Sequence, residues 1–183
     1  MSMHDASNFA DDRRAVTIRP ISPHDFELER RFIESLSPTT GYRRLFSPRK
    51  PSDDEIRRFT NIDPAREFAL IAITGDGDHE RMVGVARWVK PSAEANAAEF
   101  ALLIADDWQG KGLGTRILNS LLSEAKRQGL EQIRGETLSE NEPMLALCRK
   151  LGLSLAKQPG FAAVTQLRVE LKNWRPEVGS GIP

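Results

Sequence analysis

The sequence is poor in residues that cross-link a fold or bind metals. It contains one cysteine, Cys148, and three histidines among 183 residues. A single cysteine excludes an internal disulfide framework, and the scattered histidines do not have the spacing of metal ligands. We therefore expect no metal site and a reducing, cytoplasmic environment.

Long apolar runs and a net charge are also missing. No stretch approaches the roughly 20 apolar residues that cross a bilayer, and the N-terminal residues lack the apolar core of a signal peptide. The 26 basic and 26 acidic residues cancel to a net charge of zero. A basic cluster at residues 43–50 is offset by acids at 53–55. We therefore expect binding to neither membranes nor nucleic acids.

The length suits one domain, because 183 residues are enough for one well-buried core and short for two. We expect a disordered lead-in at residues 1–14, a globular domain at 15–172 and a flexible tail rich in proline and glycine at 173–183.

Apolar periodicity divides this domain into strands and helices. The sequence predicts strands at 15–20, 67–74, 81–89, 97–104, 130–137, 154–157 and 164–171. It predicts helices at 22–36, 52–59, 113–129 and 139–151. Turn residues at 75–78 favour an antiparallel hairpin between the second and third strands.

The most informative stretch is a glycine-rich loop at residues 106–116. It follows an apolar strand and opens an amphipathic helix, whose N-terminal amides and dipole favour an anion. Gly110, Gly112 and Gly114 suit sharp turns and close approach of the backbone to a ligand. The spacing fits neither a Walker loop nor a dinucleotide fingerprint. We interpret the loop as a pyrophosphate cradle, with a plain strand-to-helix turn as the alternative.

Two signatures resemble the GNAT family of acyl-CoA-dependent N-acyltransferases. Gln109 to Gly114 fits Q/R-x-x-G-x-G/A, and Asn141 to Leu153 is similar to N-x-x-A-x-x-x-Y-x-x-x-G-F. The resemblance covers about residues 15–171. It implies an α/β (α+β) GNAT fold, in which helices flank both faces of a central, mixed, mostly antiparallel sheet of about six to seven strands. It also implies acetyl-CoA as cofactor and coenzyme A as product.

Further segments look like the bacterial protein lysine acetyltransferases of the Pat type, which modify acyl-CoA synthetases. These segments are residues 42–47, 62–63, 98–100 and 107–110. The chain departs from the wider family at two positions, because the usual tyrosine is Cys148 and the closing phenylalanine is Leu153. The missing tyrosine weakens the assignment of a general acid, although Pat-like sequences often lack it too.

The resemblance assigns residues to both substrates. Loop amides would hold the pyrophosphate, and backbone N–H groups near Leu103 and Ile104, freed where the strand splays at a bulge, would hold the pantetheine and thioester carbonyl. Asn141 would hydrogen-bond the pantetheine arm or simply cap its helix. The implied cofactor residues are Leu102, Leu103, Ile104, Gln109, Gly110, Lys111, Gly112, Leu113, Gly114, Thr115, Asn141, Met144 and Cys148. The implied acceptor wall is Tyr42, Arg43 and Phe46.

Glu99 is the candidate general base. An amine with a pKa near 10.4 is almost wholly protonated at neutral pH, so attack on a thioester requires a base. Glu99 matches the catalytic carboxylate of the Pat-like enzymes and would act directly or through water. Strand alternation places it on one face with Ala101 and Leu103. A solvated carboxylate at a strand end is the plain alternative, and Glu136 and Glu140 are weaker candidates.

We therefore predict an acetyl-CoA-dependent N-acetyltransferase that transfers an acetyl group directly to an amine, foremost a protein lysine. Two alternatives stay open, a small-amine or antibiotic acetyltransferase and an acyl-CoA-binding sensor without turnover. An acyl-cysteine route through Cys148 is disfavoured, because a buried helix cysteine without a nearby histidine is usually inert. The protein is expected to be a monomer or a homodimer.

Overall fold

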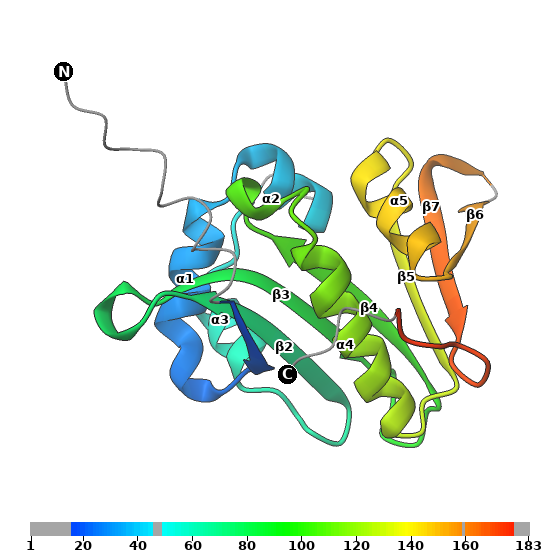
Figure 1. Ribbon diagram of the computed structural model, residues 1–183, viewed down its shortest axis with the longest axis horizontal. Helices are drawn as coiled ribbons and strands as arrows, with labels where there is room; N and C mark the ends of the chain where they lie inside the picture. Colours follow the sequence, from blue (N-terminus) through cyan, green and yellow to red (C-terminus); the bar gives the residue numbers. More distant parts are fainter. Residues whose placement is uncertain (1–15, 46–48, 159, 178–183) are drawn as a thin grey trace.

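The computed structural model describes residues 16–45, 49–158 and 160–177 (Figure 1). The predicted lead-in and the end of the predicted tail lie outside these ranges. Three short 3-10 helices are η1 (Pro23–Asp25), η2 (Gly77–His79) and η3 (Asp106–Trp108). The strands and α-helices are β1 (Thr17–Pro20), α1 (Phe26–Ser35), α2 (Pro38–Leu45), α3 (Asp53–Thr60), β2 (Glu67–Thr74), β3 (Arg81–Val89), β4 (Ala97–Ile104), α4 (Leu113–Arg127), β5 (Gln132–Leu138), α5 (Glu142–Lys150), β6 (Ser154–Gln158) and β7 (Phe161–Glu170).

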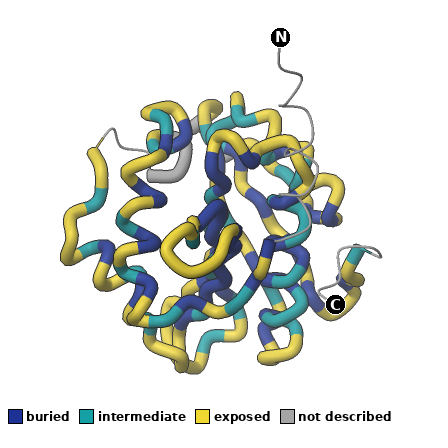
Figure 2. Tube along the Cα trace, turned by 60° about the vertical axis from the view of Figure 1, so that its left-hand side comes forward, coloured by how far each residue is buried: buried dark blue, intermediate teal, exposed yellow. Residues whose placement is uncertain are grey.

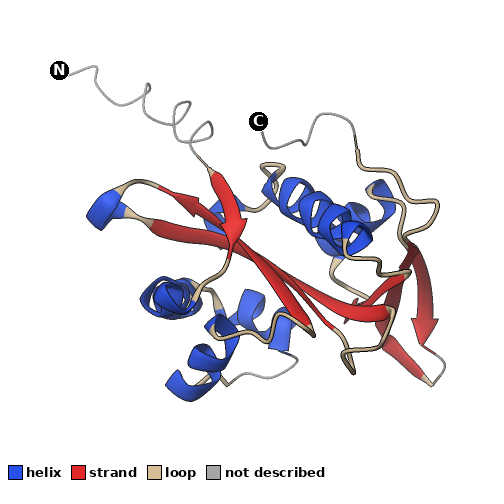
Figure 3. Ribbon diagram, turned by 90° about the horizontal axis from the view of Figure 1, so that it is seen from below, coloured by secondary structure: helices blue, strands red, loops and turns tan. Residues whose placement is uncertain are grey.

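The seven described strands form one sheet in the order β1-β2-β3-β4-β5-β7-β6. Neighbouring strands are antiparallel except β4 and β5, which run parallel. Figure 3 shows the sheet between two layers of helices, with α1, α2 and α3 on one face and α4 and α5 on the other. A mixed, mostly antiparallel sheet with helices on both faces confirms the predicted fold class.

The core lies on both sides of the central strands, because helices cover both faces. Nearly every residue of β2 is buried, and Figure 2 shows buried positions concentrated along the strands and the inner sides of the helices. Helix α4 buries the apolar stripe that its periodicity predicts, Leu113, Ile117, Leu118, Leu121, Leu122 and Ala125. Within the described ranges, none of the helices combines the length and the apolar character needed to cross a bilayer.

The parallel pair β4 and β5 stays together over three residues only, where Ala97–Glu99 lies opposite Gln132–Arg134. Beyond Glu99, β4 pairs with β3 alone, in an unbroken register that reaches Ile104. The two strands therefore part without the expected bulge in β4. β5 pairs with β7 along its whole length.

Helix α2 occupies a segment for which the sequence predicted no regular structure. The Ser37 carbonyl accepts the Gly41 N–H at 3.0 Å, and Ser37 Oγ accepts the Thr40 N–H at 3.2 Å, so Ser37 is the N-cap. Glycine and threonine lower the helix propensity of this stretch. In the sequence, Pro38 indicates the end of α1. Proline is equally favourable at the first position of a new helix, which is the position it occupies in α2.

The tail predicted to be flexible from residue 173 begins with packed residues. Trp174 is buried, and its indole Nε1 donates to the Leu151 carbonyl at 2.9 Å. The backbone N–H of Glu177 donates to Asn119 Oδ1 at 3.0 Å. The predicted boundary is therefore too early, because the indole and these hydrogen bonds hold residues 173–177 against α4 and the end of α5.

We expect Gly135→Ala to destabilise the fold by about 1–3 kcal/mol, the usual range for overpacking. A Cβ at Gly135 would lie 2.7 Å from the Phe100 ring and 3.2 Å from the Phe100 carbonyl oxygen. The matched control is Gly41→Ala, because a Cβ there meets nothing within 4 Å and lies in a helix. Urea unfolding measures both changes, and equal stabilities for the two variants would contradict this packing.

Candidate active site

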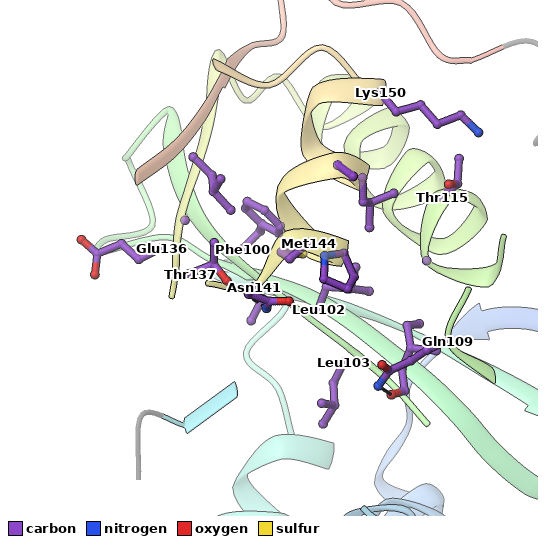
Figure 4. Close-up of a pocket in the computed structure, with 18 of the residues that line it drawn as sticks. Phe100, Leu102, Leu103, Gln109, Thr115, Glu136, Thr137, Asn141, Met144 and Lys150 are labelled. Atoms are coloured by element: carbon purple, nitrogen blue, oxygen red, sulfur yellow. Dashed lines mark hydrogen bonds between the residues drawn. The ribbon is translucent and has the colours of Figure 1, made fainter. Parts of the chain in front are cut away.

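A groove of about 1100 Å³ opens where β4 and β5 part. Its walls come from β4, the loop before α4, β5 and α5 (Figure 4). The structure brings most of the residues predicted to bind the cofactor to this groove, namely Leu102, Leu103, Ile104, Gln109, Gly110, Gly112, Gly114, Thr115, Asn141 and Met144. Lys111, Leu113 and Cys148 are not among its lining residues.

The three glycines of the loop serve two different purposes. Gly110 and Gly112 have φ of 71° and 85°, and a Cβ on either would meet nothing within 4 Å. They are needed for the left-handed backbone rather than for space. Gly114 lies in the first turn of α4, where a Cβ would come 3.2 Å from Leu147 on α5. Gly112 is the N-cap of α4, so the first amides of that helix open on the groove side of the loop.

The hydrogen-bonding direction along β4 follows from one bond at the end of the strand. The Ala105 N–H donates to the Val83 carbonyl of β3 at 2.9 Å. Because peptide groups alternate along an antiparallel strand, the N–H of Leu103 also faces β3, whereas those of Leu102 and Ile104 face the groove. The amides available to a ligand are therefore those of Leu102 and Ile104, and the expectation for Leu103 is corrected.

The side chains of Gln109 and Lys111 contact the protein itself. Gln109 Nε2 donates to the Ile104 carbonyl at 3.1 Å and to Thr40 Oγ1 at 3.3 Å, so its amide group supports the loop from within. Lys111 Nζ lies 5.7 Å from the centre of the Trp108 ring. Gln109 can therefore bind a diphosphate only through its backbone N–H. Lys111 can approach a diphosphate only if its ammonium group leaves the Trp108 ring.

Helix α5 presents Asn141 and Met144 to the groove, while Cys148 points into the core. Asn141 makes no side-chain cap bond, and its Nδ2 donates to Thr137 Oγ1 at 3.1 Å. Asn141 lines the groove without capping α5, which sets aside the helix-cap alternative. Cys148 is fully buried, and burial raises the pKa of its thiol to about 12.

Glu99 lies on β4 at the last paired position before the strands part. Its Oε1 is 3.2 Å from Nη2 of Arg134 on β5, and the two side chains are 68% and 49% exposed. Glu99 shares its face of the sheet with Ala101 and Leu103, whose partners on β3 are Arg87 and Val85. This is the face that α1 and α3 cover, so the carboxylate is on the side opposite α4.

A second, smaller pocket of about 140 Å³ lies on that face, between α1, α2, α3 and β3. Tyr42 lines this pocket, and Leu103 lines both the pocket and the groove. In Figure 4, Leu103 points away from Met144 and Phe100. The side chain of Arg43 and all of Phe46, predicted to form the same wall, lie outside the described residues.

The floor of this pocket holds charges that the sequence did not reveal. Arg87 Nη2 lies 3.5 Å from Glu29 Oε1, and the side chains are only 12% and 3% exposed. Burial lowers the pKa of Arg87, while the Glu29 carboxylate opposes that shift. Arg87 Nη1 also donates to the Phe59 carbonyl at 3.2 Å. Two sequence features could have indicated this pair. Arg87 is a charged residue among apolar ones in a strand, and Glu29 lies within the apolar stripe of a helix.

The family comparison agrees with this architecture. The chain matches the family model described as an acetyltransferase (GNAT) domain over residues 15–154. It therefore belongs to the GNAT family of acetyltransferases.

Named relatives share this assignment. An acetyltransferase from Pseudomonas aeruginosa is 33% identical over 150 residues, covering 81% of this chain and 80% of that protein. Acetyltransferase Pat from Mycolicibacterium smegmatis is 27% identical over 152 residues, covering 83% of this chain but 45% of that protein. The GNAT domain of S. lividans PAT superposes with a TM-score of 0.76 and 25% identity, covering 85% of this chain and 90% of that domain.

The cofactor follows from the family. A Salmonella typhimurium protein of the same fold was solved with its cofactor acetyl-CoA, with a TM-score of 0.69 and 18% identity over 90% of this chain and 99% of that one. The chain is an acetyl-CoA-dependent N-acetyltransferase. Its groove has the parts such a cofactor needs, since outward amides on β4 and at the start of α4 stand along one cavity.

We expect Cys148 to resist alkylation in the folded protein. Its thiol has a raised pKa of about 12 because it is buried, so very little thiolate exists even at pH 9. Iodoacetamide labelling followed by mass spectrometry should be slow at pH 9 and become rapid in urea. Labelling of the folded protein at the rate of a free thiol would show that Cys148 is accessible.

Proposed function

We propose that this chain transfers the acetyl group of acetyl-CoA directly to the amine of a protein lysine, within a ternary complex, and that acyl-CoA synthetases are the target class. The observation that carries the proposal is the pocket of about 140 Å³ across β4 from the groove. Sites for whole small molecules are commonly about 300–1,000 Å³. This pocket suits one extended side chain better than a complete small-molecule acceptor, and the match to Pat agrees with that choice.

In this proposal the two substrates meet at β4. The groove side holds the cofactor through the amides of Leu102 and Ile104, the first turn of α4 and Asn141. The acceptor lies on the opposite face, against Tyr42 and Leu103. Direct transfer needs both at once, and the burial of Cys148 leaves no accessible thiol in the described structure to carry the acetyl group.

Glu99 acts as the general base in this scheme. Glu99 and Leu102 are three residues apart on β4, about 10 Å at the usual rise of a strand. A proton from an amine near Leu102 therefore reaches the carboxylate through ordered water rather than by direct contact. Because Glu99 is exposed, water can reach its carboxylate, and the ion pair with Arg134 positions the carboxylate where β4 and β5 separate.

The bound thioester supplies an activated acetyl group. The deprotonated amine nitrogen forms the new C–N bond, the C–S bond breaks, and the thiolate leaves and takes its proton from solvent. Negative charge grows on the carbonyl oxygen during attack, and an N–H of Leu102 or Ile104 directed at it would contribute about 3–4 kcal/mol. Cys148 is too deep to replace the missing tyrosine as an acid.

We expect Glu99→Gln to lower kcat by about 10²–10⁴-fold, the usual contribution of a general base. The dissociation constant for coenzyme A should stay unchanged, because Glu99 lies outside the loop that is proposed to hold the diphosphate. The residual activity should rise steeply with pH as the acceptor amine loses its proton unaided. Glu136→Gln and Glu140→Gln serve as matched controls and should retain activity. Full activity in Glu99→Gln would remove Glu99 from this role.

The acceptor is identified by incubating the protein with labelled acetyl-CoA and three groups of acceptors. These are an acyl-CoA synthetase, a panel of small amines including polyamines and aminoglycosides, and no acceptor. The proposal predicts acetyl-lysine in the synthetase, located by peptide mass spectrometry. Label only in the small amines would establish the small-amine alternative, and tight binding of coenzyme A without any transfer would establish the sensor.

A further inference from the structure

The cofactor loop and the acceptor-side helix are joined by one carboxylate. Asp106, the first residue of η3, follows β4 directly and begins the loop. Its Oδ2 accepts the Ser37 backbone N–H at 3.0 Å, and its Oδ1 accepts the hydroxyls of Ser37 and Thr40, both at 2.7 Å. Three donors from the start of α2 therefore converge on a residue 69 positions further along the chain than Ser37.

This arrangement completes the cap of α2 from outside the helix. In a capping box, the side chain at the third helical position reaches back to the N–H of the N-cap residue. The third position of α2 is Thr40, whose hydroxyl is too short for that contact, and Asp106 takes the place of the missing acceptor. A helix of eight residues is marginal on its own, so α2 depends on such contacts.

The two ends of this linkage belong to different sites. Ser37, Gly41 and Tyr42 line the acceptor pocket, whereas Thr40 lines the cofactor groove. Thr40 Oγ1 also accepts from Gln109, whose Nε2 holds the Ile104 carbonyl. Burial would raise the pKa of Asp106, but the hydrogen bonds from Ser37 and Thr40 outweigh it and hold the pKa below its usual value. The carboxylate is therefore ionised at neutral pH, as three donors require.

We propose that Asp106 is a positioning residue that fixes the start of α2 on the cofactor loop, so that binding of coenzyme A sets the position of the acceptor wall. The inference goes beyond the proposed chemistry and rests on the acceptor lying beside α2. Asp106 touches neither substrate. It acts through Ser37 and Thr40, which carry the position of the loop to Tyr42.

Tyr42 allows this coupling to be measured without knowing the acceptor. It is the only tyrosine in the sequence, lies on α2 and is 45% exposed. Protein made with 3-fluorotyrosine therefore gives one ¹⁹F resonance that reports on α2. We expect this resonance to shift during titration with coenzyme A, with the same midpoint as calorimetric binding.

Asp106→Asn should break the coupling and keep the binding. Asparagine has one acceptor oxygen, so its NH₂ group would face a donor of Ser37 or Thr40. Calorimetric affinity for coenzyme A should stay within about tenfold of wild type. The ¹⁹F shift should fall by about fivefold or more, the lower end of usual coupling factors.

Asp107→Asn is the matched control, since the adjacent carboxylate accepts from the Arg81 guanidinium of β3 at 2.8 Å through both oxygens. It should keep the full shift. Thr40→Val tests the same linkage from the other side and should lose the shift even if Asp106→Asn folds poorly. An unmoved resonance in wild type, or a full shift in either Asp106→Asn or Thr40→Val, would overturn the proposal. Absence of any coenzyme A binding to wild type would overturn the proposed function as well.

Discussion

Backbone N–H and C=O groups inside a sheet must find partners, and β4 loses its partner on one edge beyond Glu99. The cost of leaving such groups unpaired is about 1–3 kcal/mol each when they are buried. This edge lines the groove, and three antiparallel strands hold β4 in register on its other edge. The outward amides of Leu102 and Ile104 are thereby fixed in direction before any ligand arrives, which is the condition for strong stabilisation of charge. One carbonyl of this edge, that of Ile104, is already satisfied by Gln109.

The parting of the strands also organises the second half of the domain. β5, β7 and β6 form a separate antiparallel group with α5 packed beside it, and this group makes the far wall of the groove. Gly135 lies just past the last position of β5 that pairs with β4, and a Cβ there would clash with the Phe100 ring. A single strand, β4, lies between the groove and the smaller pocket, which the proposed function assigns to the donor and the acceptor.

Much of this could be predicted from the sequence, since the signals are local. The apolar stripe of α4, the glycine loop and the strand before it have strong periodicity and turn chemistry. These features predicted both the fold class and the cofactor. What the sequence could not give depends on contacts between distant residues. The direction of the β4 amides depends on pairing with β3, so the sequence could not show that the N–H of Leu103 faces β3 while those of Leu102 and Ile104 face the groove. The cap of α2 comes from Asp106, and neither segment alone indicates it.

Other differences have the same origin. Trp174 lies at the start of a segment whose proline and glycine content suggested a loose tail, but its indole stays packed because it donates a hydrogen bond to the Leu151 carbonyl. Cys148 occupies the position of a tyrosine in a linear signature, yet the rotation of α5 places it in the core and leaves Met144 and Leu147 at the groove. The buried pair of Glu29 and Arg87 joins residues 58 positions apart, and such a pair is visible only in three dimensions.

The most direct measurement is residue-resolved amide hydrogen exchange with and without coenzyme A. The account predicts that Ala101 and Leu103, bonded to β3, are protected in the free protein, whereas Leu102 and Ile104 exchange faster and become protected when coenzyme A binds. Slow exchange of Leu102 and Ile104 in the free protein, or no change at either on binding, would contradict the claim that the open edge of β4 holds the cofactor.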